Sequence, residues 1–252
     1  MAEVPQSKVF QDTDLPAQGR RDGPKELVIE VQGGVQLQTN KAVMMERIPL
    51  LRNTLNATQR LNWAQVPENA AQAVLDYVNT GKLRITQENE GSIIALARIL
   101  QLPKLEQWGV DFMSRSITLN RLPPTWQLAT SANIPALQEH CLSFKKTHIA
   151  AVGAIDFFVG LPPDIVLSIL KNDKLAADSE NKIVEAITHW LLPCPGYNRP
   201  EEYRLKQAKD LFKEVRWDLT TASFRREVFL QCNNLTHDEE ATSIKECSEA
   251  CA

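Results

Sequence analysis

The sequence lacks the features that would place it in a membrane or on a nucleic acid. No stretch approaches the roughly 18 consecutive apolar residues that a transmembrane helix needs, and the first residues lack the apolar core of a secretory signal. Its 28 Lys and Arg residues are offset by 31 Asp and Glu residues, and no basic block stands out. We therefore expect a soluble protein of the cytoplasm, with the nucleus as an alternative, that binds neither membrane nor nucleic acid.

Residue sets for chemistry are also missing. The five cysteines match no zinc-site spacing, so we expect reduced, buried thiols, with metal binding through Cys247 and Cys251 as a minor alternative. His140 and Cys141 are adjacent, and on a helix their side chains would point about 100° apart, so they cannot form a nucleophile–base pair. The sequence predicts no enzyme, no cofactor, and no catalytic, cofactor-binding or metal-binding residues. A hydrolase using Cys141 or Cys194 is the least favoured alternative.

What is present begins with a strand pattern. Apolar residues recur at every second position of 27–31, which predicts a strand with one buried face. Gly33 and Gly34 predict a two-residue hairpin turn, because both of its central positions need a positive φ. Asn40 stands where a helix N-cap belongs. Residues 1–25, with three prolines, are expected to form a flexible tail, and a short strand around residues 8–11 is the alternative.

Helical spacing follows. Residues 41–55 carry an apolar stripe at helical spacing, which Pro49 interrupts. Residues 61–66 predict a third strand. A helix is expected to begin near residue 69 and to end at Gly81, which predicts a left-handed C-cap. A brief extended piece at 83–85 and helices at 88–100 and 104–117 complete the first half. Beyond residue 118 only helices are predicted, with Ser179 as one N-cap and with Trp190 and Trp217 buried; their ranges are 126–132, 135–147, 150–158, 163–170, 180–191, 201–212 and 223–231.

Several motifs carry a resemblance to a known family. Residues 75–83, Leu-Asp-Tyr-Val-Asn-Thr-Gly-Lys-Leu, and 100–105, Leu-Gln-Leu-Pro-Lys-Leu, resemble hallmark segments of the BTB (POZ) domain. Residues 157–162, Phe-Phe-Val-Gly-Leu-Pro, and 186–190, Ala-Ile-Thr-His-Trp, resemble segments of the BACK domain. The chain thus resembles a BTB–BACK protein of the kelch-like family without the kelch propeller.

The resemblance implies a fold and a domain order. We expect an α+β BTB/POZ domain, a small sheet with helices, over residues 26–117. An all-α BACK domain is expected over 118–250, and its first helices, within 118–150, would lie near a bound cullin. The chain ends at Ala252, where a propeller would begin. Either a longer chain exists or substrates are recognised in another way.

The family also implies a function. Its members are substrate-specific adaptors of cullin–RING ubiquitin ligases built on the third cullin, dimerise through the BTB domain, and hold a substrate protein close to the ubiquitin-transfer machinery. The substrate of this chain is unknown. The alternative is an oligomerising BTB–BACK scaffold with no cullin binding and no ubiquitin role. It is favoured by residues 56–60, Asn-Ala-Thr-Gln-Arg, which lack the glutamate of the family's cullin anchor.

Eight residues are candidates for the cullin interface under this resemblance. Two of them, Leu51 and Leu55, have packing in the core as an equally good explanation, whereas Gln59 and Arg60 belong to a loop and have no such explanation. The full set is Met44, Leu51, Leu55, Ala57, Gln59, Arg60, Leu122 and Leu128.

Overall fold

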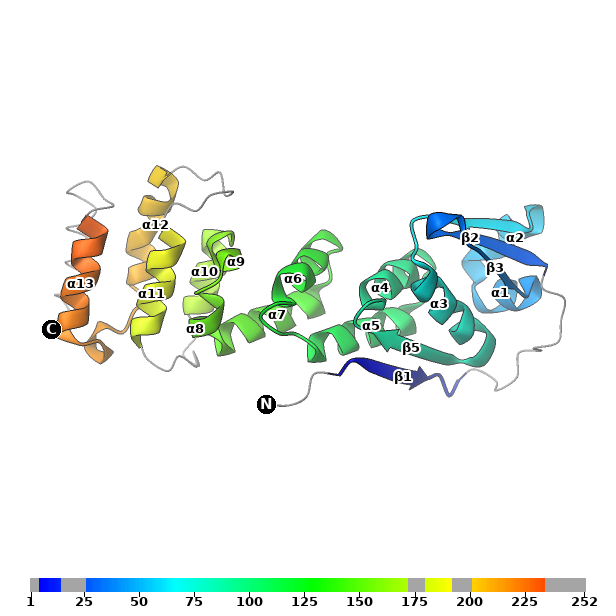
Figure 1. Cartoon of the computed structure of the whole chain (residues 1–252), viewed down its shortest axis with the longest axis horizontal. Coiled ribbons are helices and arrows are strands. Elements are labelled where there is room, and N and C mark those ends of the chain that lie inside the picture. Colours follow the sequence, from blue (N-terminus) through cyan, green and yellow to red (C-terminus); the bar gives the residue numbers. More distant parts are fainter. Residues whose placement is uncertain (1–4, 15–25, 172–179, 192–200, 234–252) are drawn as a thin grey trace. The chain divides into compact units, whose positions relative to one another are not determined.

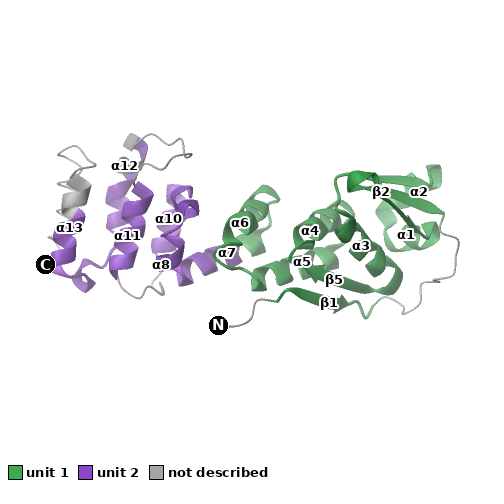
Figure 2. Cartoon of the chain, viewed as in Figure 1, with its two compact units in different colours: residues 1–138 green, residues 139–252 purple. Residues whose placement is uncertain are grey.

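The computed structural model describes residues 5–14, 26–171, 180–191 and 201–233 (Figure 1). It divides into two compact units, Met1–Gln138 and Glu139–Ala252, which are described separately (Figure 2). Among the described residues, no helix combines the length and apolarity that a bilayer crossing requires.

Unit 1 contains a three-stranded sheet in the order β3–β2–β4. β2 (Leu27–Val31) pairs antiparallel with β3 (Gln36–Thr39) and parallel with β4 (Arg60–Trp63). The predicted alternation is confirmed, because Leu27, Ile29 and Val31 are all fully buried. The two-residue turn is wrong: residues 32–35 connect the strands, since η1 (Gln32–Gly34) inserts a turn of 3-10 helix. Both glycines nevertheless have the expected positive φ, 82° and 77°.

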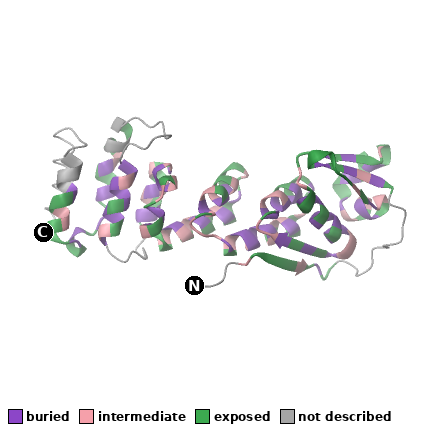
Figure 3. Cartoon of the chain, in the orientation of Figure 1, coloured by how far each residue is buried: buried purple, intermediate pink, exposed green. Residues whose placement is uncertain are grey.

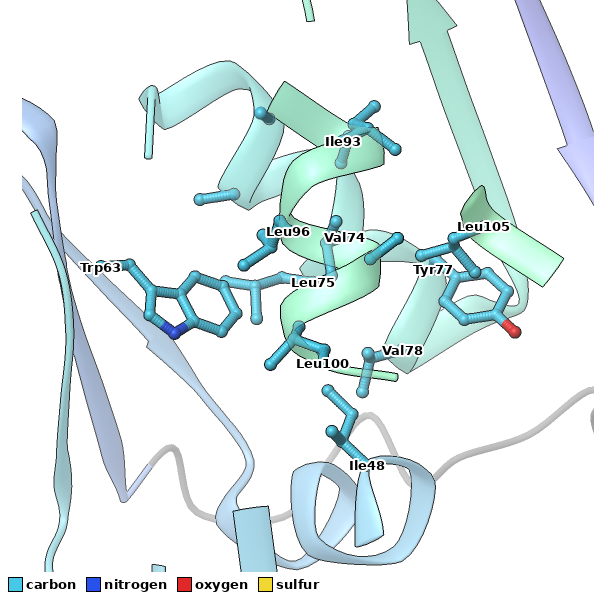
Figure 4. Close-up of a cluster of buried hydrophobic side chains, with 14 of the residues drawn as sticks. Ile48, Trp63, Val74, Leu75, Tyr77, Val78, Ile93, Leu96, Leu100 and Leu105 are labelled. Carbon is cyan, nitrogen blue, oxygen red and sulfur yellow. The ribbon is translucent and has the colours of Figure 1, made fainter. Parts of the chain in front are cut away.

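The helices of unit 1 before α7 are α1 (Lys41–Arg47), the 3-10 turn η2 (Pro49–Leu51), α2 (Arg52–Ala57), α3 (Glu68–Thr80), α4 (Glu90–Ile99), α5 (Pro103–Arg115) and α6 (Leu122–Ser131). α3 buries seven apolar side chains and lies within the core shown in Figure 4. It ends where predicted, at Gly81 with φ 72°, whose N–H donates to the Tyr77 carbonyl at 2.7 Å.

Part of the N-terminal region belongs to a second sheet. β1 (Ser7–Gln11) pairs antiparallel with β5 (Lys82–Thr86). The predicted tail is therefore wrong over these five residues, and the alternative strand is confirmed. Two distant contacts hold it: Phe10 stacks on Trp108 with 5.3 Å between ring centroids, and the Asp12 carboxylate accepts hydrogen bonds from Tyr77 and Lys104.

In the described part of unit 2 every regular element is helical. α7 (Pro135–Thr147) enters it from unit 1 and is followed by α8 (Ile149–Val152), α9 (Asp156–Val159), α10 (Pro163–Leu170), α11 (Glu180–Leu191), α12 (Glu201–Phe212), η3 (Trp217–Leu219) and α13 (Ala222–Asn233). Trp190 and Trp217 are buried as predicted, and their indole N–H groups donate to the carbonyls of Leu161 and Phe212. The Ser179 cap lies outside the described residues.

The single helix predicted over residues 150–158 is wrong, because α8 and α9 are separate turns on either side of Gly153. This glycine permits close packing. A Cβ built on it would lie 2.3 Å from the Cβ of Ala186 on α11, a distance that real Cβ atoms do not adopt. α8 can therefore contact α11 only because residue 153 has no side chain.

Gly153→Ala is expected to lower the free energy of unfolding of unit 2 by about 1–2 kcal/mol, because the added methyl group overpacks this contact. Hydrogen exchange of α8 and α11 measures the change. The control is Gly91→Ala on α4, where the nearest atom lies at 3.7 Å and no destabilisation is expected. Equal exchange in wild type and Gly153→Ala would contradict the prediction.

Candidate protein-interaction surface

The structure separates the eight predicted interface residues by burial. Met44, Leu51, Leu55 and Leu122 are buried in the core, so the packing explanation holds for Leu51 and Leu55. Leu128 is partly buried against a cluster that includes Ile94 and Ala129. Ala57, Gln59 and Arg60 are exposed. Only these last three present their side chains freely to another protein.

Local sequence explains how this surface forms. The Asn40 side chain caps α1 by accepting the Val43 N–H at 3.1 Å, as predicted. Pro49 then ends the helical phase and opens η2, which turns Leu51 into the core and leaves Leu50 47% exposed. Leu50 was not among the predicted interface residues. Its position one residue before the inward-facing Leu51 was the signal that could have found it, since neighbours on a helix point in different directions.

Backbone hydrogen bonds hold the segment that connects α2 to β4. The Val28 N–H donates to the Gln59 carbonyl at 3.0 Å, and the Arg60 N–H donates to the Thr58 hydroxyl at 3.1 Å. The backbone of Gln59 and Arg60 is thus held at the start of β4, and both residues are exposed. We name the exposed set of Leu50, Ala57, Gln59 and Arg60 the α2 surface.

The α2 surface has a positive charge. Arg60 belongs to it, and Arg52 lies beside it with its Nε donating to the Met45 carbonyl at 2.8 Å. No Asp or Glu occurs between residues 49 and 62. Acidic groups on a partner would complement these two arginines.

The α6 candidates do not belong to the same patch. In Figure 1, α4 and α3 lie between α6 and α2 within unit 1. Leu122 is fully buried at the start of α6, next to Arg121, which forms a buried ion pair with Glu90. Burial lowers the pKa of Arg121 below its ordinary value. The exposed positions of α6 include Pro124 and Gln127, which lie within the segment 122–128 that was expected near the cullin face.

A cavity of about 250 Å³ lies in unit 2, around α8 and α11. Small residues line it, together with Lys182, Glu185 and His189. The His189 Nδ1 must carry its proton, because it lies 2.8 Å from the Gly153 carbonyl, which can only accept. Lys182 pairs with Glu185 at 2.7 Å. These groups are engaged with their neighbours and do not form a nucleophile–base set.

The buried thiol likewise offers no reactive group. Cys141 is fully buried on α7, and burial raises its pKa to about 11, so the thiol stays protonated. Lys145, one turn further on, is also buried, which lowers its pKa to about 7. Cys194, Cys247 and Cys251 lie outside the described residues. Within those residues, no group of three or more His, Cys, Asp or Glu side chains could hold a metal ion.

Comparisons with known proteins agree with this architecture. Residues 23–117 match the model of the BTB/POZ domain, and residues 124–229 match the model described as BACK, "BTB And C-terminal Kelch". Relatives include Kelch repeat and BTB domain-containing protein 8 of Danio rerio, 24% identical over 66% of this chain, and Kelch-like protein 3 of Homo sapiens, 25% identical over 66%. Kelch-like protein 40 of Xenopus tropicalis is 23% identical over 58%.

The matched part of the chain spans 29%, 28% and 23% of the lengths of these three relatives. The α+β module and the helical module that follows it correspond in order to the two matched domains. The chain therefore has a BTB/POZ domain followed by a BACK domain and belongs to the family of BTB–BACK proteins that includes the kelch-like proteins.

Proposed function

We propose that this protein is a substrate adaptor of a cullin–RING ubiquitin ligase built on the third cullin. The observation that carries the proposal is the succession of a BTB/POZ domain and a BACK domain. The protein would supply no chemistry of its own. It would dimerise through the BTB domain and hold a substrate protein close to the transferred ubiquitin, which raises the rate by proximity.

The α2 surface is the proposed cullin contact. It offers one large exposed apolar side chain, Leu50, and the exposed polar side chains of Gln59 and Arg60. Protein interfaces commonly combine apolar anchors with polar residues. The segment 118–150 remains the proposed second contact, and residues 26–117 and 118–250 remain the proposed limits of the two domains.

A scaffold without cullin binding is the second candidate. The observation that favours it is the loop 56–60, which carries Arg60 and no carboxylate where the family's cullin anchor has a glutamate. Without that glutamate the segment offers a cullin no carboxylate, so this part of the expected contact is missing.

Sedimentation of the purified chain with the N-terminal region of the third cullin separates the two candidates. Under the adaptor proposal the two proteins co-sediment, and Leu50→Asp weakens binding at least tenfold, because it places a charge in an apolar contact. Leu55→Asp would be uninformative, since Leu55 is fully buried and a charge there would unfold the domain.

Ile99→Asp is the matched control. Ile99 is 67% exposed at the end of α4, outside the α2 surface, so its variant should bind as wild type does. No complex at micromolar concentrations would favour the scaffold. Full binding by Leu50→Asp would place the cullin contact elsewhere on the protein.

A further inference from the structure

The cavity beside α8 and α11 has an apolar side and a polar side. The two helices meet at Gly153 and Ala186, and both residues line the cavity. Its polar side belongs to α11, which carries both buried and exposed residues (Figure 3). The polar groups occupy positions 182, 185 and 189, which share one side of the helix because they are three and four residues apart. The volume of about 250 Å³ is below the roughly 300–1,000 Å³ of small-molecule pockets, so the cavity suits a single side chain.

His189 contributes a hydrogen-bond acceptor to this cavity. Its Nδ1 donates to the Gly153 carbonyl at 2.8 Å. This carbonyl lies at the C-terminal end of α8, where carbonyl groups lack partners within the helix. The hydrogen bond therefore fixes the tautomer and the orientation of the imidazole. In the neutral ring, Nε2 then carries a lone pair and no proton, and it has no hydrogen-bond partner among the described residues.

Glu185 contributes a second acceptor, which is charged. Its Oε2 accepts the Lys182 Nζ at 2.7 Å, and its Oε1 has no partner within the described part of the chain. Both side chains of this ion pair are about half exposed, so the pair contributes little and a cationic ligand can replace Lys182 at small cost. Glu185 and His189 are one helical turn apart, with Cβ atoms about 5–6 Å from each other. A ligand with several donors can therefore reach both acceptors.

We propose that this cavity binds an arginine side chain of a partner protein. A guanidinium is planar and has five N–H donors, so it can donate to Glu185 and to the Nε2 of His189 at the same time. The methylene groups of the arginine would contact the methyl groups of Ala150 and Ala154, which also line the cavity. Since the guanidinium is always charged, it can take the place of Lys182 beside the carboxylate.

Other ligands fit these groups less well. A lysine ammonium is a compact charge and lacks the planar fork that reaches two acceptors at once. An anion would require a second proton on His189 and would lie close to the like charge of Glu185. The arginine side chain uses both acceptors and needs no change in the protonation of His189.

The first test uses N-acetyl-arginine N-methylamide, which presents the side chain between neutral amides. Added at millimolar concentrations to the full ¹⁵N-labelled chain, it should shift the amide resonances of α8 and α11. The citrulline derivative has the same length but no charge, and it should bind at least fivefold more weakly. The glutamate derivative should leave these resonances unchanged. Free L-arginine, whose backbone groups are charged, should bind no more tightly than the arginine derivative.

The second test uses variants that change the affinity in opposite directions. Glu185→Gln should weaken binding of the arginine derivative at least tenfold, because the charged acceptor is lost. Lys182→Ala should strengthen binding about threefold, because the competing cation is removed. Ala154→Leu, at an exposed position, should block the cavity. Glu139→Gln, exposed on α7 outside the cavity, is the matched control and should bind as wild type does. Unchanged Trp190 fluorescence verifies that each variant is folded.

The outcomes also separate this proposal from the proposed function. Absence of any shift in α8 and α11, equal binding of the arginine and citrulline derivatives, or unchanged affinity in Glu185→Gln would overturn the proposal. Weaker binding to Lys182→Ala would overturn it as well, since the site would then bind an anion. Free L-arginine binding tenfold more tightly than its derivative would indicate a small-molecule site instead.

Arginine binding is independent of the cullin contact. The cavity belongs to unit 2, whereas the α2 surface belongs to unit 1. Only the use of the cavity to recognise a substrate protein rests on the proposed function. Sedimentation with cullin, measured separately, decides the adaptor proposal whatever the result at the cavity.

Discussion

Replacing Glu180 with alanine is expected to lower the free energy of unfolding of unit 2 by about 3 kcal/mol, the lower end of the range for breaking a buried ion pair. The Glu180 carboxylate, at the start of α11, is only 2% exposed. It accepts hydrogen bonds from the backbone N–H of Arg216 at 2.8 Å and from the Nε and Nη2 atoms of the Arg216 guanidinium at 3.2 and 2.9 Å. Arg216 is half exposed and regains water in the variant, which places the loss at the lower end.

The same helix provides the control for this prediction. Glu185 pairs with Lys182, but both side chains are about half exposed, so Glu185→Ala should cost less than about 0.5 kcal/mol. Hydrogen exchange over α11 and α12 distinguishes the two variants, and Trp190 and Trp217 report the same unit by fluorescence. A Glu180→Ala protein as stable as Glu185→Ala would mean that the contact between Glu180 and Arg216 contributes nothing.

Elements with a strong local pattern could be predicted from the sequence. α7, α10, α11 and α12 have the predicted bounds, because apolar residues at helical spacing and nearby prolines define them without help from distant contacts. β2 was predictable for a similar reason, since a strand buried on one face alternates strictly. In each case one local period determines both the element and its buried face.

β1 was predicted only as the alternative to a flexible tail, and the break at Gly153 was not predicted. Phe10 stacks on Trp108, which lies almost a hundred residues later in the chain, and no local hydrophobic period predicts such a contact. At Gly153 the neighbour that requires a glycine is Ala186, on another helix. The exposure of Leu50 could not be predicted for a related reason. Pro49 ends α1 and begins the 3-10 turn η2. The geometry of this turn decides that Leu50 is exposed and Leu51 buried, and the sequence does not specify that geometry.

The second large effect is expected at Asp12, which anchors β1. Its carboxylate accepts the Tyr77 hydroxyl at 2.9 Å, the Lys104 Nζ at 2.9 Å and the Asp14 N–H at 3.0 Å, and the residue is only 4% exposed. Asp12→Ala leaves the Tyr77 hydroxyl buried without this acceptor. We expect a loss of about 2–3 kcal/mol in unit 1, as for hydrogen bonds to a charged group, and faster hydrogen exchange in β1 and β5.

Asp14→Ala is the control for this loss. Asp14 also binds Lys104, at 2.6 Å, but its side chain is 78% exposed, so its removal should change the stability of unit 1 little. Equal exchange of β1 in the Asp12→Ala and Asp14→Ala proteins would show that Asp12 does not anchor the strand.

The effect of Asp12 also depends on pH. Burial alone would raise the pKa of Asp12, but the hydrogen bonds from Lys104, Tyr77 and the Asp14 backbone outweigh it and hold the pKa below its ordinary value. A carboxylate with a depressed pKa stabilises the fold at pH values above its unfolded pKa of about 3.9, and this contribution disappears as pH falls through the folded pKa. The stability difference between wild type and Asp12→Ala should therefore be constant near neutral pH and shrink below about pH 4. Urea unfolding followed from pH 7 to pH 3 measures it. A difference that grows in acid would mean that burial dominates and that the carboxylate is held protonated.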